Sequence, residues 1–271
     1  MKLPSEKIFL APMEEVNDPA FRMLCKKTGA LTYTGMTHPM TQKKQILEDK
    51  PILQLFCKTP EGTKEFMKRY DKEVSGWDLN LGCPAKNAKK HGFGSFLKDL
   101  KIIEEIIKTM RENTKKPLSI KFRKADYSFE LLEIAEKYCN WICIHPRTQA
   151  QGYSGKADLD FALKIKDYSS IPVIYSGDVN EKNIKELLKN FDYIMIGRAA
   201  IGNPNIFSKL NNKKEVTFKD YLKLAEKYKL PFRQVKFQAV NFTKGLRDST
   251  KTRVELCKCK NLDELKKIYR Y

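Results

Sequence analysis

Cys83 is the side chain with the clearest chemical potential in this chain of 271 residues. It stands in the segment Asn80-Leu-Gly-Cys-Pro84, directly after an apolar run. An ordinary thiol has a pKa near ~8.5, so at neutral pH it is mostly protonated and can donate a proton. A nucleophilic role would require a base beside it. Lone cysteines are more often small buried hydrophobes. We expect that of Cys25, Cys57, Cys139 and Cys143.

Two glycine-containing turns could bind an anion. Ser176-Gly177-Asp178 and Gly197-Arg198 each follow an apolar run. Glycine lets backbone N–H groups approach a ligand closely, and Arg198 adds a positive charge. Either turn alone could be an ordinary connection between a strand and a helix. Because the two runs are consecutive, the pair favours a ligand that carries phosphate.

The sequence predicts neither a metal site nor a hydrolase triad. None of the three histidines, His38, His91 and His145, forms an H-x-x-x-H pair, and no C-x-x-C spacing occurs. The C-x-C element that ends at Cys259 has no second pair to complete a zinc site. A G-x-S-x-G nucleophile motif is also absent. We therefore expect no bound metal.

The elements that must position these residues alternate along the first 210 residues. Short apolar, β-branched runs are separated by stretches with helical periodicity, a pattern typical of parallel βα units. Asp18-Pro19 and Thr59-Pro60 both look like helix starts, and Gly29 looks like a helix end. The predicted strands are Lys7–Pro12, Ala30–Thr34, Ile52–Phe56, Gly76–Leu81, Pro117–Phe122, Trp141–His145, Ile171–Ser176 and Phe191–Ile196.

Eight strands in about 200 residues predict an α/β fold, a (β/α)8 TIM barrel over residues 1–210. A doubly wound open sheet is the alternative, but the first strand is not followed by a G-x-G-x-x-G turn. Barrel enzymes carry their chemistry at the carboxyl ends of the strands. In order, the residues at or just beyond these ends are Pro12 with Met13, Gln54, Asn80 with Cys83, Lys121 with Arg123, His145 with Arg147, Ser176-Gly177-Asp178 and Gly197-Arg198. All but the first pair include a polar or reactive side chain.

The positive charge is concentrated in the last 59 residues. The whole chain has a net charge of +19, and residues 213–271 hold 17 Lys and Arg against 7 Asp and Glu. This segment also shows helical periodicity, with a break at Pro231, and we expect a small basic domain of about four helices. Such a charge favours a polyanionic partner, nucleic acid or an anionic membrane surface, although a lysine-rich proteome could also produce it.

Composition excludes several classes of protein. Hydrophobic residues make up 41% of the chain and recur along its length, which excludes intrinsic disorder. No apolar run approaches the ~20 residues of a membrane-spanning helix, and the first residues do not form a secretory signal. Seven cysteines without a disulfide-framework spacing predict a reducing, cytoplasmic location.

Taken in order, these motifs resemble the tRNA-dihydrouridine synthases, FMN-dependent enzymes that reduce the C5–C6 double bond of uridine in tRNA. The resemblance covers about residues 8–208. Beyond residue 213 the chain resembles, more loosely, the helical RNA-binding domain of the family. The matching segments are Leu10-Ala-Pro-Met13, Asp18-Pro19-x-Phe21-Arg22, Gln54-Leu-Phe56, Asp78-Leu-Asn80-Leu-Gly-Cys83-Pro84, Gly92-x-Gly94, Lys121-x-Arg123, His145-x-Arg147-Thr148, Gln151-Gly-Tyr-Ser-Gly155, Gly177-Asp178 and Met195-Ile-Gly-Arg-Ala-Ala-Ile-Gly-Asn-Pro204.

The resemblance also implies a role for each matching residue. Cys83 would be the general acid that protonates C5 of the uracil, while reduced FMN gives a hydride to C6 and NADPH, or NADH, reduces the flavin. Asn80, Arg123 and Arg147 would contact the substrate. The cofactor would be bound by Pro12, Met13, Glu14, Gln54, Lys121, His145, Ser176, Gly177, Asp178, Gly197 and Arg198.

Two residues depart from the family pattern. Many relatives have Asn at the position of Ser176 and Gly at that of Pro146, which lacks an N–H to donate to the flavin. The implied partners are tRNA and NAD(P)H, with no membrane and no obligate protein partner. An FMN barrel that acts on a free pyrimidine, as dihydroorotate or dihydropyrimidine enzymes do, and a non-catalytic RNA-binding barrel are the alternatives. The sequence leaves the modified uridine position and the oligomeric state open.

Overall fold

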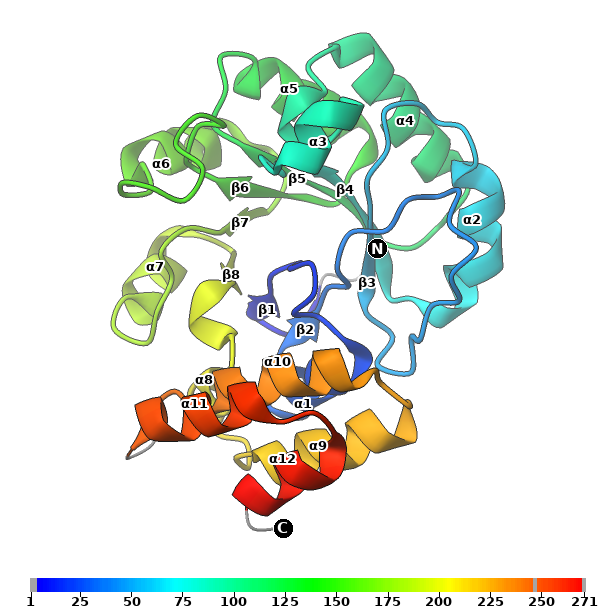
Figure 1. The fold of residues 1–271 in the computed structure, drawn as a ribbon. Helices are drawn as coiled ribbons and strands as arrows, with labels where there is room; N and C mark the ends of the chain where they lie inside the picture. The colour runs from blue at the N-terminus through cyan, green and yellow to red at the C-terminus, as the bar shows by residue number, and fades with distance from the viewer. Residues whose placement is uncertain (1–3, 246–247, 270–271) are drawn as a thin grey trace.

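The computed structural model describes residues 4–245 and 248–269. Within these residues, eight parallel strands lie side by side in the order β2-β1-β8-β7-β6-β5-β4-β3 (Figure 1). Neighbours in this order are consecutive along the chain, except where the first strand pairs with the last. The fold is therefore the predicted (β/α)8 barrel. The strands are β1 (Ile8–Leu10), β2 (Leu31–Thr32), β3 (Ile52–Leu55), β4 (Gly76–Leu81), β5 (Leu118–Arg123), β6 (Trp141–His145), β7 (Val173–Tyr175) and β8 (Tyr193–Ile196).

The barrel closes between β2 and β3 through single bridges and not through a continuous ladder. Tyr33 pairs with Ile52 and Thr37 pairs with Leu55 in parallel orientation. The loop that follows β2 is therefore extended, and within the described residues it contains no helix before β3. A buried ion pair holds this loop to the first helix, because Arg22 donates to Asp49 at 2.9 Å.

Helices surround the barrel and carry the chain from one strand to the next (Figure 1). Asp18 caps the first helix by accepting from the Phe21 N–H, with Pro19 at its start and Gly29 beyond its end at φ +97°, as predicted. The expected start at Thr59-Pro60 is wrong, since that helix begins at Thr63 after the left-handed Gly62. The helices are α1 (Pro19–Lys27), α2 (Thr63–Tyr70), α3 (Lys86–His91), α4 (Leu100–Glu112), α5 (Ser128–Tyr138), α6 (Leu159–Tyr168), α7 (Ile184–Asn190) and α8 (Asn205–Asn211).

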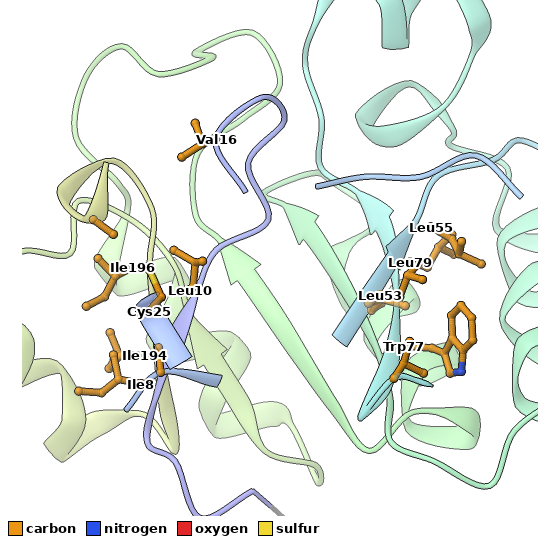
Figure 2. Close-up of a cluster of buried hydrophobic side chains, with 14 of the residues drawn as sticks. Ile8, Leu10, Val16, Cys25, Leu53, Leu55, Trp77, Leu79, Ile194 and Ile196 are labelled. Carbon is orange, nitrogen blue, oxygen red and sulfur yellow. The ribbon is translucent and has the colours of Figure 1, made fainter. Parts of the chain in front are cut away.

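Alternation along the strands separates two buried regions. Ile8 and Leu10 belong to the large cluster between the strands and the surrounding helices, whereas Phe9 belongs to a smaller cluster. Successive side chains of a strand point to opposite faces, so the smaller cluster fills the barrel interior. Figure 2 shows two parts of the large cluster, one on β1 and β8 and the other on β3 and β4.

In the described part of the basic C-terminal segment there are four helices, and the first of them packs against α1 (Figure 1). Asp18 joins the two parts, because its carboxylate also accepts from Tyr221, Gln234 and Gln238. Among the described residues, no helix combines the length and the apolar character needed to cross a bilayer. The four helices are α9 (Phe218–Lys227), α10 (Phe232–Phe242), α11 (Ser249–Lys258) and α12 (Leu262–Ile268).

Candidate active site

A pocket lies at the carboxyl ends of the strands, where a barrel of this kind places its chemistry. It encloses about 570 Å³ of empty space, part of which is open to the solvent. Glu14 and Gln54 are the two predicted cofactor residues that do not line it. The nine that do are Pro12, Met13, Lys121, His145, Ser176, Gly177, Asp178, Gly197 and Arg198.

The turns after β7 and β8 form the end of this pocket that is suited to an anion. In the part of the chain that the structure describes, the backbone N–H groups of Gly177, Asp178 and Gly197 donate to no protein acceptor. Gly177 must be a glycine, because a Cβ there would come within 2.8 Å of the Ala157 Cβ. Arg198 begins a short 3-10 helix at the same place. Free N–H groups beside an arginine fit a phosphate group.

Asp178 organises the arginines of this end. Its carboxylate pairs with Arg147 at 2.6 Å and with Arg198 at 2.9 Å. Although burial acts to raise it, the hydrogen bonds from Arg147 and Ala157 and the charge of Arg198 lower the pKa of Asp178. The residue therefore stays ionised and holds Arg198 at the pocket.

His145 is neutral at physiological pH. Burial and the surrounding charges of Lys121, Arg123, Arg147 and Arg198 lower its pKa to about 2. The Arg147 Nη1 lies 3.2 Å from the His145 Nε2, and because an arginine can only donate, that nitrogen must accept. The proton of the imidazole is therefore on Nδ1. His145 can offer a neutral N–H donor to a bound ligand but not a positive charge.

Arg123 and Arg147 serve mainly to hold loops together. Arg147 is 1% exposed and donates to Asp178 and to the carbonyls of Ser154 and Gly155. Arg123 donates to the carbonyls of Gly82, Thr148 and Gly152. The structure thus places both side chains inside the wall of the site and not at its surface, where direct contact with a macromolecule would occur.

Tyr153 lines the same pocket and was not identified as a site residue from the sequence. It is 61% exposed, and the Arg123 and Arg198 guanidinium groups each lie 5.3 Å from the centre of its ring. A large aromatic residue left exposed between two cations at a pocket mouth is suited to stack on a planar ligand. Its place in the Gln151–Gly155 segment was the only sequence signal for it.

Cys83 is half-buried in the loop after β4, and three neighbours fix its backbone. The Ser95 N–H and hydroxyl both donate to the Cys83 carbonyl, and the Cys83 N–H donates to the Asn80 side chain at 2.9 Å. Gly94, at φ +62°, packs so closely that a Cβ would lie 2.9 Å from the Cys83 carbonyl oxygen. The loop is therefore held in one position.

A buried chain of hydrogen bonds connects this loop to the barrel interior. Asn80 accepts from the Gly82 and Cys83 N–H groups and donates to Gln54 Oε1, and Gln54 Nε2 donates to Asp78 at 2.6 Å. Backbone N–H groups only donate, so they set the orientation of the Asn80 amide and, through it, that of Gln54. Burial raises the pKa of Asp78 to about 7, against the hydrogen bonds from Ser119 and Gln54.

This chain limits what Asn80 and Gln54 can do for a ligand. The oxygen of each amide is already an acceptor within the protein, and the remaining N–H of Asn80 faces the sulfur of Met36 at 3.9 Å. Both residues were predicted from the resemblance to contact ligands directly. The structure instead brings them together beneath Cys83, where they position its loop.

The Cys83 thiol remains protonated at neutral pH. Burial raises its pKa above that of an ordinary thiol, and the Glu14 carboxylate raises it further, while a hydrogen bond from Ala85 and the charges of Arg123 and Lys121 oppose the rise. Such a group can donate a proton, and the nearby cations favour the thiolate that remains. Among the described residues, no group of three or more His, Cys, Asp and Glu is placed to hold a metal ion.

Comparisons with known proteins identify the family of this barrel. A relative from Aquifex aeolicus, named probable tRNA-dihydrouridine synthase, is 29% identical over 98% of this chain and 96% of its own length. One of the same name from Rickettsia conorii is 34% identical over 84% of this chain and 73% of its own.

Solved structures agree on the fold. A structure titled TcOYE with pHBA aligns over 79% of this chain and 92% of its own length, with a TM-score of 0.57 and 10% sequence identity. Because the identity is low, this similarity supports only the barrel fold. The family model of dihydrouridine synthase (Dus) matches residues 9–270, which is nearly the whole sequence. The chain therefore belongs to the dihydrouridine synthase family.

Proposed function

We propose that this chain is a tRNA-dihydrouridine synthase that uses FMN and NADPH to reduce the C5–C6 double bond of uridines in tRNA. Family membership supports the reaction, since the relatives named above carry that activity in their names. The observation that carries the proposal is local. A protonated thiol, Cys83, is held rigidly at the same end of the barrel as a pocket suited to a phosphate-bearing cofactor.

The residues of the pocket fit FMN. The N–H groups of Gly177, Asp178 and Gly197, with Arg198, would hold its phosphate, and Lys121 with the neutral His145 would contact its ring and ribityl chain. Ser176, at the position where many relatives have Asn, also lines the pocket and keeps a hydroxyl that can donate. When bound and reduced, FMN supplies the hydride for C6 of the uracil.

Cys83 supplies the proton. Its thiol would protonate C5 of the uracil, leaving a thiolate that Lys121 and Arg123 stabilise until solvent returns the proton. The rigid loop keeps the donor at a fixed position, which is what proximity catalysis requires. The Asn80–Gln54–Asp78 chain contributes by holding that loop and not by touching the proton.

The basic helices would bind the tRNA. Residues 213–271 hold about half of the excess positive charge. Helix α9 of this segment packs directly against α1. The uridine must leave its base stack to reach the pocket, which costs a few kcal/mol and less in an unpaired loop. Contacts of lysines and arginines with phosphates offset this cost, and binding should weaken as salt is raised.

Reconstitution tests the proposal. Purified protein would be incubated with unmodified tRNA, FMN and NADPH or NADH, and dihydrouridine would be measured by mass spectrometry. We expect dihydrouridine with the wild type, none above background with Cys83→Ala, and wild-type yield with Cys257→Ala, which removes an exposed cysteine. Full activity of Cys83→Ala would contradict the proton-donor role. Reduction of free uracil or of orotate in place of tRNA would support the free-pyrimidine alternative.

A further inference from the structure

A second cavity adjoins the Cys83 loop and shares no lining residue with the flavin pocket. It encloses about 850 Å³ of empty space, partly open to the solvent, between the start of the loop after β3 and helix α3. Four rings, one lysine and Glu14 are part of its wall. The lining residues that matter here are His38, Phe56, Lys58, His91 and Phe93.

The four rings of this cavity form one continuous cluster. Phe56 and Phe93 lie 4.3 Å apart between ring centres, and His38 packs edge-on to Phe56 at 5.3 Å. His91 is exposed and lies almost parallel to Phe93, with an angle of 12° between the rings and 6.5 Å between their centres. Stacked aromatic surfaces at the mouth of a cavity suit a flat, uncharged group.

The wall of the cavity contacts the loop that holds the proton donor. Phe93 immediately precedes Gly94, whose backbone packs against Cys83. Glu14 lines the cavity and also raises the pKa of the Cys83 thiol, so its carboxylate lies near both. A group bound here would therefore sit next to the group that Cys83 protonates.

The charge around the cavity suits a polyanion that carries flat groups. Lys58 lines it, and helix α3 exposes Lys86, Lys89 and Lys90. His38 adds a hydrogen-bond donor, because its Nδ1 accepts from the Met40 N–H and its proton is then on Nε2. Burial lowers the pKa of His38, against the charge of Glu61, so the ring is neutral at pH 7.

We propose that this cavity binds one unstacked base of the RNA substrate, adjacent in sequence to the uridine that is reduced. The proposal rests on the proposed function and adds to it a second base-binding site. Aromatic rings stack on any base, and lysines around them meet the flanking phosphates. A nicotinamide would be an unsuitable occupant, because a hydride donor must contact the flavin and this cavity shares no lining residue with the flavin pocket.

His91→Ala tests the stacking contact, and His91→Phe is its matched control because it restores an aromatic ring. His91 is exposed at the end of α3, so neither change threatens the fold. The dissociation constant for unmodified substrate tRNA would be measured by fluorescence anisotropy. We expect it to rise about fivefold or more in His91→Ala and to return to within about twofold of wild type in His91→Phe.

A charge pair and a spectroscopic probe complete the test. Lys58→Ala should weaken tRNA binding more than Lys101→Ala, which removes an exposed lysine of α4. An RNA stem-loop with 2-aminopurine beside the target uridine should lose fluorescence on binding wild type and less on binding His91→Ala. Unchanged tRNA affinity in His91→Ala, equal loss in His91→Phe, or an effect confined to the KM for NADPH would each overturn the proposal.

The two proposals fail in different ways. If wild-type protein forms no dihydrouridine in tRNA, the proposed function fails whatever the variants show. If wild type forms dihydrouridine and His91→Ala binds tRNA as wild type does, the proposed function stands and the second base site is overturned.

Discussion

Gly94→Ala should damage catalysis far more than it damages stability, and Gly92→Ala is its matched control. Both glycines lie in the same loop with left-handed backbones, at φ +73° for Gly92 and +62° for Gly94. A Cβ at Gly92 would meet nothing within 4 Å, whereas one at Gly94 would lie 2.9 Å from the Cys83 carbonyl oxygen and 3.0 Å from its Cβ. The two substitutions share a conformational cost and differ only in contact with Cys83.

The left-handed conformation costs an alanine roughly 1–2 kcal/mol, partly offset by the lower entropy of the unfolded chain. We therefore expect Gly92→Ala to lose about 1 kcal/mol in the free energy of unfolding. Gly94→Ala must in addition move the Cys83 backbone by a few tenths of an ångström and strain its bonds from Ser95. Overpacking of this kind costs about 1–3 kcal/mol more.

Urea denaturation would measure the stability of both variants, and single-turnover reduction of tRNA uridine would measure the chemical step. A displacement of about 1 Å at a reacting group can cost ~100-fold in rate, so a smaller shift of Cys83 should cost about tenfold or more. We expect Gly92→Ala to react at nearly the wild-type rate. Equal rates for the two variants at saturating tRNA would refute the idea that Gly94 positions the proton donor.

Three further predictions concern the groups around the site. The rate of the chemical step should be level through neutral pH and fall only at a pH above the ~8.5 pKa of an ordinary thiol, because burial raises the pKa of the Cys83 thiol and the donor is lost on deprotonation. A fall near pH 7 would contradict this. Gln54→Met should lower the free energy of unfolding, measured in urea, by about 2–4 kcal/mol, since Asp78 loses a donor and the buried Asn80 amide loses its acceptor. A loss below about 1 kcal/mol would show that these hydrogen bonds contribute little to stability. Asp18→Ala should lower the free energy of unfolding by a similar amount and weaken tRNA binding, because it removes the cap of α1 and the acceptor of three side chains from the C-terminal helices. Unchanged thermal stability would contradict this prediction.

The barrel could be predicted from the sequence because the alternation of apolar runs and helical stretches repeats along the chain. Every predicted strand is present, and two of them, Gly76–Leu81 and Trp141–His145, have the predicted bounds in the structure. The two glycine-containing turns after the last two strands both line the pocket, in agreement with the expectation from their occurrence on consecutive runs. These features depend on neighbours in the sequence, so local patterns are enough to find them.

The support of Cys83 could not be predicted in the same way. The hydrogen bonds among Gln54, Asp78 and Asn80 depend on strand register, which pairs Gln54 with Asp78 across β3 and β4. The resemblance to the family implied direct ligand contacts for Gln54 and Asn80, because it transfers roles by position and carries no information about these hydrogen bonds. Tyr153 is absent from the predicted site, because its contacts with Arg123 and Arg198 join parts of the chain that are distant in sequence.

Helix starts and domain contacts show a similar limit. Asp18-Pro19 and Thr59-Pro60 look alike as sequence, but only Asp18 has its side chain on the helix N-terminus. The second role of Asp18, as acceptor for Tyr221, Gln234 and Gln238, joins segments about 200 residues apart. Contacts between residues so far apart in the sequence cannot be recognised from a local sequence pattern.

The dihydrouridine content of tRNA tests the central claim most directly. Dihydrouridine positions would be mapped by mass spectrometry in tRNA from cells that have the gene, from cells that lack it, and from deleted cells that express wild type or Cys83→Ala. We predict that at least one dihydrouridine is lost on deletion, returns with wild type and does not return with Cys83→Ala. A map that is identical with and without the gene would contradict the claim that this chain reduces uridine in tRNA.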